Sequence, residues 1–166
     1  MMNDYDHCGD LAILTLPKTA FLCSRQVPAE VVLRCYDWAI RMREEGRCVI
    51  SGFHSPLEQD VLHYLLKGKQ PVIMALARGL KSKWEPRIQK ALEEGRLLLI
   101  SPFGEQVKRA SADTAAVRND LMIRLADEVV VGYADPLGML SNRLRIEREK
   151  KVVFLGKFSM NQAINP

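Results

Sequence analysis

The sequence predicts an α/β fold in which a doubly wound, mostly parallel sheet carries helices on both faces. Two patterns lead to this prediction. Short apolar runs recur along the chain without strict alternation, which is typical of strands buried on both faces of a parallel sheet. Amphipathic segments with helix start and stop signals lie between these runs, and the connections are short.

Six apolar runs are expected to form the strands. They cover residues 20–23, 48–51, 72–77, 97–101, 128–132 and 152–155. No run approaches the ~18 apolar residues that a membrane-spanning helix needs, so we expect no membrane partner. The beginning of the chain lacks the basic and apolar regions of a secretory signal, which predicts a cytoplasmic location.

The first helix is expected between Pro28, which suits a first helical position, and Gly46, which suits the position after the last turn. Its core-facing stripe is Val32, Cys35, Ala39 and Met42. The second helix should begin at Ser55, because Ser55-Pro56-Leu57-Glu58 has the pattern of a capping box. The residues that continue its apolar face up to Gly68 are Leu57, Val61 and Leu65.

Three further helices are expected in the second half of the chain. Ser82 and Glu85 form another capping-box pattern at the start of a helix within 82–95. Asp113 is expected to cap the next helix, within 113–126, and its inward-pointing residues are Val117, Leu121 and Leu125. The last helix should begin at Asp135-Pro136 and run to about Arg148.

The composition fits one domain. Hydrophobic residues make up 48% of the 166 residues and charged residues 27%, an ordinary globular balance in a chain long enough to bury a core. We therefore expect a single domain over residues 1–166, with a lead-in segment at 1–18 and a loose extension at 157–166.

The cysteines are expected to be buried, reduced thiols. No two of them form a CxxC or another close pair, so the sequence predicts no metal site, and it indicates no cofactor. The four residues are Cys8, Cys23, Cys35 and Cys48.

Candidate ligand contacts follow the predicted strands, because ligands of open α/β sheets bind outside the carboxyl ends of the strands. Several of these loops also open helices, whose free N–H groups favour anions. The net charge is only +4, but segments 77–84 and 106–112 contain cations and no acid. We expect a phosphate-bearing ligand, and the alternative is a solvated basic rim without one. The expected contacts are Ser24, Arg25, Gly52, His54, Ser55, Arg78, Gly79, Lys81, Lys83, Gly104, Lys108 and Arg109.

Four residues near this edge allow two interpretations each. His54 is either a ligand contact and proton donor or an ordinary loop histidine. Glu58 is either a capping-box partner only or a site carboxylate. Trp84 lies near Lys81 and Lys83 and either stacks on a base or packs, whereas Trp38 is expected in the core.

The order of several motifs resembles the DprA/Smf family, the DNA-processing proteins of bacterial transformation. An apolar run ends in Ser101-Pro102-Phe103-Gly104, a helix with Arg118-Asn119-Asp120 follows, and then a valine-rich run at 128–132. Phe21-Leu22-Cys23-Ser24-Arg25 resembles the family's Val-Gly-Ser-Arg strand end, with Cys23 in place of the glycine. Ser51-Gly52 opens a loop similar to the family's Ser-Gly-Leu-Ala-Arg-Gly-Ile-Asp, although Ser55 replaces its arginine. Asp120 replaces a second arginine.

The resemblance covers about residues 9–155 and implies a Rossmann-like core that binds single-stranded DNA. It adds Arg118, Asn119 and Gly138 to the expected contacts, and the chain is expected to be a stand-alone core without the winged-helix domain of many members. A related fold family, the lysine-decarboxylase-like phosphoribohydrolases, uses a Pro-Gly-Gly-x-Gly-Thr-x-x-Glu stretch that this sequence lacks.

We therefore expect a domain that binds single-stranded DNA or a nucleotide-like ligand through a basic rim, without turnover and with no catalytic residue. One alternative is an enzyme that hydrolyses a nucleotide N-glycosidic bond, with Glu58 or Asp135 as the acid/base group. Another is a nucleotide-sensing or protein-interaction module. Formation of a homo-oligomer is left open.

Overall fold

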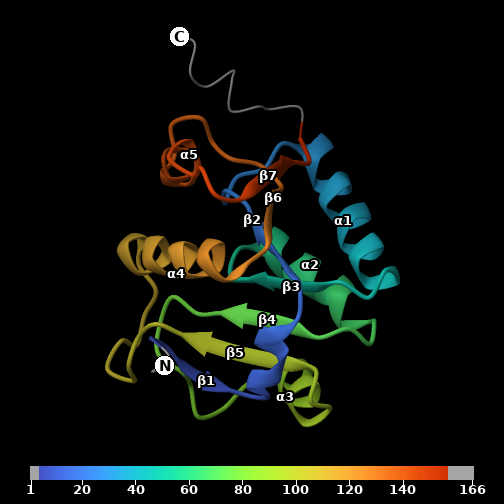
Figure 1. The fold of residues 1–166 in the computed structure, drawn as a ribbon, viewed down its shortest axis with the longest axis vertical. Helices are drawn as coiled ribbons and strands as arrows, with labels where there is room; N and C mark the ends of the chain where they lie inside the picture. Colours follow the sequence, from blue (N-terminus) through green and yellow to red (C-terminus); the bar gives the residue numbers. More distant parts are fainter. Residues whose placement is uncertain (1–3, 157–166) are drawn as a thin grey trace.

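The computed structural model describes residues 4–156 and shows a wound sheet with strand order β1-β5-β4-β3-β2-β6-β7 (Figure 1). Within this range β1 alone is antiparallel to its neighbour, β5, and every other pairing is parallel. The strands are β1 (Asp6–Cys8), β2 (Lys18–Leu22), β3 (Cys48–Ser51), β4 (Val72–Ala75), β5 (Leu97–Ser101), β6 (Glu128–Val131) and β7 (Lys151–Phe154). The helices are α1 (Ala29–Glu44), α2 (Pro56–Leu66), α3 (Pro86–Glu93), α4 (Ala112–Leu125) and α5 (Met139–Arg145), with a short 3₁₀ helix at Leu11–Thr15.

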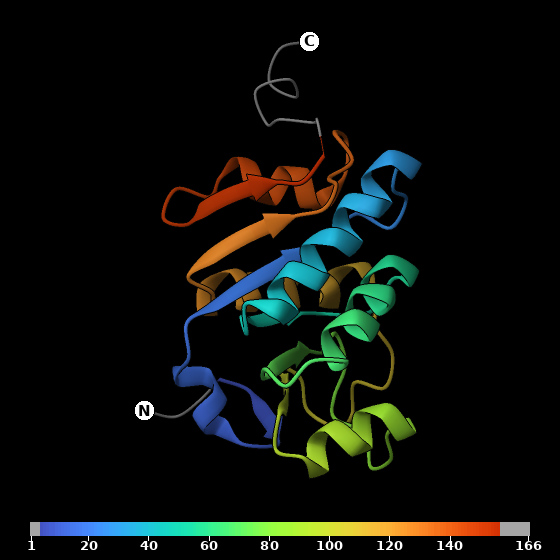
Figure 2. The same cartoon turned by 90° about the vertical axis from the view of Figure 1, so that its right-hand side faces the viewer.

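The predicted fold class is confirmed. Helices α1, α2 and α3 cover one face of the sheet, and α4 and α5 lie on the other (Figures 1 and 2). Each face has its own apolar core: Trp38 and Leu65 pack with Phe21 and Val49 on the first face, and Met122 packs with neighbouring strand residues on the second. Successive strand residues thus point into opposite cores, which is why the runs are apolar throughout.

All six predicted strands are present, with ends that differ by no more than two residues from the expected ones. The lead-in segment also contains a strand that the sequence did not predict. Asp6, His7 and Cys8 pair with the edge strand β5, and Gly9, at φ 111°, turns the chain close against Leu97. The extension at 157–166 lies outside the described residues.

Several helix predictions were wrong in detail. Ser111, not Asp113, caps α4. Of its expected inward residues, Leu121 is buried and Leu125 partly buried, but Val117 is 47% exposed and Arg118 is buried in its place. Glu85 stands at the N-cap of α3 without a capping hydrogen bond from its side chain, so the predicted second capping box is absent. Helix α5 begins only at Met139, because residues 135–138 form a turn in which Asp135 Oδ1 accepts from Leu137 N at 3.0 Å.

The other helix signals hold better. Ser55 and Glu58 form the predicted capping box of α2, and Gly46 and Gly95 adopt positive φ after α1 and α3. The buried stripe of α1 is Val31, Cys35, Trp38 and Ala39, and the expected Val32 and Met42 are only partly buried.

Strand order reverses direction between β2 and β6. The chain moves from β2 through β3 and β4 to β5 on one side, and then crosses to β6 and β7 on the other. At such a point the loops that follow the two central strands leave in opposite directions, and a crevice opens between them. The residues after β2 and β6 are therefore the first place to look for a ligand site.

Candidate ligand-binding clefts at the strand carboxyl ends

A cleft of about 780 Å³ opens at this reversal of strand order, within the usual size range of small-molecule sites. We call it the α4 cleft. Its walls come from the loops after β2, β3 and β6 and from the first half of α4. It is lined by Cys23, Ser24, Arg25, Gln26, His54, Ser55, Glu58, Ala77, Ala110, Ser111, Ala112, Ala115, Ala116, Arg118, Asn119, Asp135, Gly138, Met139 and Leu140.

Hydrogen bonds fix the two central loops to each other. Ser24 N donates to Tyr133 O at 2.7 Å, and Asp135 N donates to Ser24 Oγ at 2.8 Å. Ser24 is therefore engaged in holding the loop after β2 against the loop after β6. The side chain of Arg25, the next residue, is exposed at the mouth of the cleft.

Small residues of α4 form one wall of the α4 cleft. Ala112, Ala115 and Ala116 line the cleft. Ala115 and Ala116 lie three and four residues after Ala112, so both are its neighbours on one face of the helix. The helix is anchored by a capping box in which Thr114 N donates to Ser111 Oγ at 3.2 Å. Since alanine side chains are short, this wall leaves space next to the cleft's polar residues.

Glu58 lies in the α4 cleft but is occupied by its capping role. The residue is only 6% exposed, and its Oε1 accepts from Ser55 N at 3.0 Å. Its Oε2 accepts from Ser51 Oγ at 3.4 Å. Ser51 Oγ also donates to Phe21 O at 2.8 Å, so the contact to Oε2 is the weaker one. The predicted capping-box role of Glu58 is confirmed.

Arg118 is the most buried cation at this edge of the sheet. It lies in the middle of α4 and is 8% exposed. Its Nε donates to Asn119 Oδ1 at 3.0 Å. Burial lowers the pKa of the Arg118 guanidinium, and the negative charge of Glu58 partly opposes this effect. No carboxylate of residues 4–156 forms an ion pair with Arg118.

Gly52 provides the place where the Arg118 guanidinium rests. A Cβ on Gly52 would lie 2.6 Å from Arg118 Cζ and closer still to Nη1, so the guanidinium occupies the volume of the missing side chain. The next residue, Phe53, is buried and has a φ of 45°, a conformation that is strained for a bulky residue. The loop after β3 is thus shaped around Arg118.

A second cleft, of about 370 Å³, adjoins the first one and is much more basic. We call it the tryptophan cleft. Six of its lining residues are cations, and one is an acid. It is lined by Gly52, Phe53, His54, Gln59, Leu62, Met74, Leu76, Ala77, Arg78, Lys81, Trp84, Glu85, Arg87, Ile88, Lys108, Arg109, Ala110 and Arg118.

The aromatic ring of Trp84 is partly buried against the core, and Lys81 Nζ lies over it at 5.7 Å from the ring centroid. Four residues line both clefts, namely His54, Ala77, Ala110 and Arg118. The buried guanidinium of Arg118 therefore stands at the junction of the two clefts.

The structure brings together most of the expected contact residues. Those in the α4 cleft are Ser24, Arg25, His54, Ser55, Arg118, Asn119 and Gly138, and those in the tryptophan cleft are Gly52, His54, Arg78, Lys81, Lys108, Arg109 and Arg118. Arg25 and Arg118 face the same cleft, as expected. The cleft also holds Glu58 and Asp135, however, so it is not the purely basic rim that the sequence predicted.

Three expected contacts line neither cleft. Lys83 is an exposed residue beside them. Gly79 and Gly104 pack against each other: a Cβ on Gly79 would lie 2.8 Å from the carbonyl carbon of Gly104. Gly79 N also donates to Val107 O at 2.9 Å. The missing side chain of Gly79 thus lets the loop after β4 approach the backbone of the loop after β5, whereas a Cβ on Gly104 would meet the side chain of Gln106.

Sequence reasoning missed two features of the site. Cys23 and Cys35 are distant in sequence, but both Sγ atoms lie next to Gly132, where a Cβ would be 3.0 Å and 2.8 Å away from them. A hydrogen bond to Cys35, together with burial, raises the pKa of the Cys23 thiol, which keeps it protonated. Arg87 was also missed, since its position on α3 gave no motif, and it lines the tryptophan cleft.

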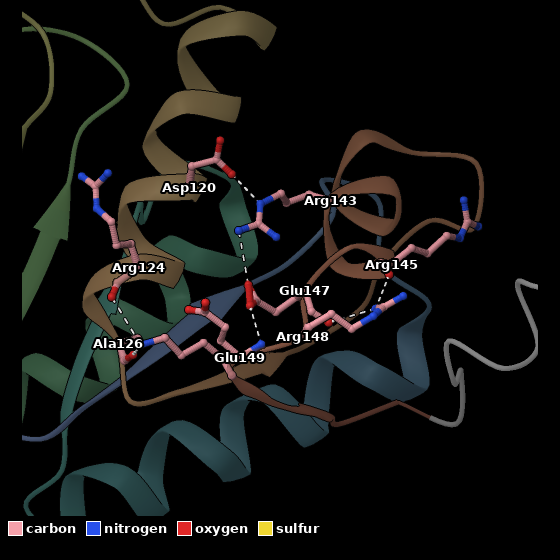
Figure 3. A network of polar contacts seen from close by, with 9 residues as sticks. Asp120, Arg124, Ala126, Arg143, Arg145, Glu147, Arg148 and Glu149 are labelled. Atoms are coloured by element: carbon pink, nitrogen blue, oxygen red, sulfur yellow. Dashed lines mark hydrogen bonds and ion pairs between the residues drawn. The ribbon is translucent and has the colours of Figure 1, made fainter.

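Asp120 faces away from both clefts and ties α5 to α4. Its carboxylate accepts from Arg143, which also binds Glu147 Oε2 at 3.3 Å (Figure 3). Lys150 Nζ continues the network by donating to the backbone of Ala126 at 2.7 Å. The network holds α5 on α4 and so supports the side of the α4 cleft that Gly138 and Leu140 line.

Residues 4–156 contain no cluster of three or more His, Cys, Asp or Glu side chains arranged to hold a metal ion. Over the same part of the chain, no helix combines the length and the apolar character that crossing a bilayer requires.

No protein-family model and no curated protein matches the sequence, but several solved structures share the fold. DNA processing protein A from Helicobacter pylori has 20% identity and a TM-score of 0.74, over 90% of this chain and 70% of that one. DprA from Streptococcus pneumoniae has 17% identity and a TM-score of 0.63, over 96% of this chain and 65% of that one. A molybdenum cofactor binding protein from Rippkaea orientalis has 15% identity and a TM-score of 0.58, over 83% and 75%. The DprA-like fold predicted from the motifs is confirmed.

Proposed function

We propose that the protein binds single-stranded nucleic acid through the α4 cleft and the tryptophan cleft, without chemical turnover. The observation that carries this proposal is the lining of the tryptophan cleft. Six cations and one acid surround a concave surface that also presents the partly buried ring of Trp84. Cationic grooves with aromatic side chains are how proteins bind single strands, because the cations contact the backbone and the rings stack on bases.

The two clefts suit different parts of a nucleotide. The tryptophan cleft carries the excess positive charge and suits phosphates. The α4 cleft mixes cations with Glu58 and Asp135 and has an alanine wall, which suits a neutral sugar and base. Arg118 stands between them, where it can contact a phosphate from either side.

The comparisons support a binding role. DNA processing protein A from Helicobacter pylori, which shares the fold, binds single-stranded DNA. The similar protein from Rippkaea orientalis binds the molybdenum cofactor. A single strand is the ligand that uses both clefts of this chain at once, whereas a small cofactor would need only one.

The hydrolase alternative has less support. Glu58 is buried and its Oε1 is held in the capping box of α2. A general acid needs a carboxyl that can reach the substrate, which disfavours Glu58. Asp135 is exposed in the α4 cleft, and its Oδ1 accepts from Leu137 N in the turn before α5.

The test is a set of fluorescence anisotropy titrations with a labelled oligodeoxythymidylate and with a panel of mononucleotides. Replacing Arg25 or Arg118 by Ala should weaken binding of the oligonucleotide by roughly 1–3 kcal/mol, the net value of a charge-assisted hydrogen bond. The matched control is Arg124→Ala, which removes one charge at a residue that lines neither cleft.

Salt dependence separates the ligand classes. A strand contacted along its backbone should lose affinity steeply as salt rises, with a slope of about 0.7 per phosphate contact on logarithmic axes. A pocketed mononucleotide should respond less. The proposal fails if the parent protein binds no oligonucleotide at low salt, or if mononucleotides bind equally tightly.

A further inference from the structure

A third concave surface follows the tryptophan cleft along α2 and α3: the tryptophan cleft is lined by Leu62 and Ile88 of these helices, and the third surface mainly by residues further along both. It has a volume of about 660 Å³ and lies between the carboxyl end of α2 and α3, two helices that stand side by side in Figure 2. We call it the α3 cleft. It is lined by His63, Leu66, Lys67, Gly68, Lys69, Arg87, Lys90, Ala91, Glu94 and Arg96.

The α3 cleft carries a large excess of positive charge. Five of its ten lining residues are Lys or Arg, and Glu94 is its single acid, in a protein whose net charge is only +4. Glu94 is shared between Lys90 at 4.0 Å and Arg96 at 3.9 Å. Lys67 and Lys69 are exposed, and among residues 4–156 no carboxylate lies within ion-pair distance of either one.

The fold engages most of these cations. Arg96 donates to the last carbonyls of α2, at 2.9 Å to Leu66 O and 3.2 Å to Leu65 O, so it serves as a cap for that helix. Lys67 lies over the ring of Tyr64 at 5.6 Å from the centroid, a contact between neighbouring residues of the same helix end. Lys67 and Lys69 are both exposed at this concave surface, and neither forms an ion pair within residues 4–156.

Arg87 connects this surface to the candidate site. It lines both the tryptophan cleft and the α3 cleft, just as Arg118 lines both the tryptophan cleft and the α4 cleft. Within residues 4–156 its guanidinium forms one ion pair, with Glu85 at 3.4 Å. The three concave surfaces thus form one continuous path, with a cation at each junction.

We propose that the α3 cleft binds the backbone of the same nucleic acid strand, so that a single strand runs from the α4 cleft through the tryptophan cleft and on between α2 and α3. This inference rests on the proposed function. Charge complementarity and continuity with the two clefts favour a phosphate backbone as the occupant. The consequence is that affinity depends on the length of the strand, and that Lys67 and Lys69 contact only the longer ligands.

The experiment compares two labelled oligodeoxythymidylates, of about 4 and about 16 nucleotides, the range of site sizes known for single-strand-binding domains. Affinity is measured by fluorescence anisotropy between about 50 and about 200 mM salt. The test variant is Lys67→Gln with Lys69→Gln, and the control is Arg124→Gln with Lys151→Gln. The control removes the same charge at the far end of the sheet, where Figure 3 shows Arg124 pointing away from its neighbours.

In the parent protein, the salt slope should be steeper for the longer strand. The Lys67/Lys69 variant should lower that slope by about 1.4, since each lost phosphate contact contributes about 0.7 for a single strand. The same variant should bind the short strand like the parent, and the control should leave both slopes unchanged.

Three results would overturn the inference. One is a parent slope that does not depend on strand length, and another is equal losses in test and control variants, which would indicate bulk charge only. The third is an unchanged slope in the test variant. In that case the positive charge of the α3 cleft does not contact the strand and would suit an acidic protein partner instead. In all three, oligonucleotides still bind. The proposed function itself fails in a different way, when neither strand binds the parent or when mononucleotides bind as tightly as the strands.

Discussion

Replacing Gly52 by Ala tests whether Arg118 acts from its buried position. The new Cβ would lie 2.6 Å from Arg118 Cζ, whereas nonbonded carbon atoms prefer about 3.5 Å. The guanidinium must therefore retreat by about 1 Å, away from the junction of the two clefts. A displacement of that size takes an N–H···O hydrogen bond out of its usual range of about 2.7–3.2 Å.

The expected loss of affinity follows from the lost hydrogen bond. A hydrogen bond to a charged group contributes roughly 1.5–3 kcal/mol, so Gly52→Ala should weaken binding of a single strand by about 10- to 150-fold. Folding stability should change little. Gly52 does not have a positive φ, so alanine fits its backbone conformation, and the less flexible unfolded chain gives back about 0.4–1 kcal/mol.

The assay is a double-mutant cycle read by anisotropy, with thermal unfolding as the check on folding. Because Gly52→Ala is expected to act through Arg118, it should have no further effect in an Arg118→Ala background. If Gly52→Ala reduces affinity equally in both backgrounds, the new methyl group blocks the ligand directly. If the single variant binds like the parent, the position of Arg118 does not matter for binding and the reasoning is refuted.

The remaining predictions concern stability. Ser55→Ala should cost on the order of 1 kcal/mol because α2 loses its cap, and an unchanged melting temperature would contradict this. Gly9→Ala should destabilise the protein by roughly 1–3 kcal/mol, since φ is 111° and the Cβ would meet Leu97 O at 2.5 Å; an unchanged urea midpoint would argue against the β1 turn. Burial raises the pKa of the Glu147 carboxyl, but a hydrogen bond from a backbone N–H and the nearby Arg143 outweigh burial and hold this pKa below its ordinary value. The ionised Glu147 therefore stabilises the folded protein fully above about pH 4.3, the pKa of an unfolded glutamate, and this contribution is lost as pH falls through the lower pKa of the folded state. Glu147→Gln should therefore destabilise the protein at pH 7 more than at pH values of about 3, and equal effects at both would disprove the pairing.

The sheet could be predicted from the sequence because most strands and helix caps are specified by a few consecutive residues. Each strand from β2 to β7 is a short apolar run, and the capping box of α2 lies within four consecutive residues. Strand β1 has neither signal. The segment from Asp6 to Cys8 is polar and mostly exposed, and it is a strand only because the edge of β5 pairs with it.

The clefts could be predicted only in part. The rule that ligands bind at the carboxyl ends of parallel strands pointed to the edge of the sheet where the α4 cleft and the tryptophan cleft open. Which residues line which cleft, however, depends on contacts between segments that are distant in sequence. Arg118 is buried because Gly52, from another strand end, has no side chain in that volume. Gly79 and Gly104 were assigned to a ligand for the same reason, since the sequence does not show that the two loops contact each other.

Departures from the DprA/Smf pattern are compensated within the chain at two positions. Asp120, where the pattern has an arginine, is paired with Arg143 of α5. Cys23, where the pattern has a glycine, packs its sulfur against Gly132 and Cys35. A residue that is satisfied by its own neighbours has no need of a ligand. The differences at 120 and 23 therefore concern how the loops are held together. A change of ligand should be sought at the exposed residues of the two clefts, namely Arg25, His54, Lys81, Lys108 and Arg109.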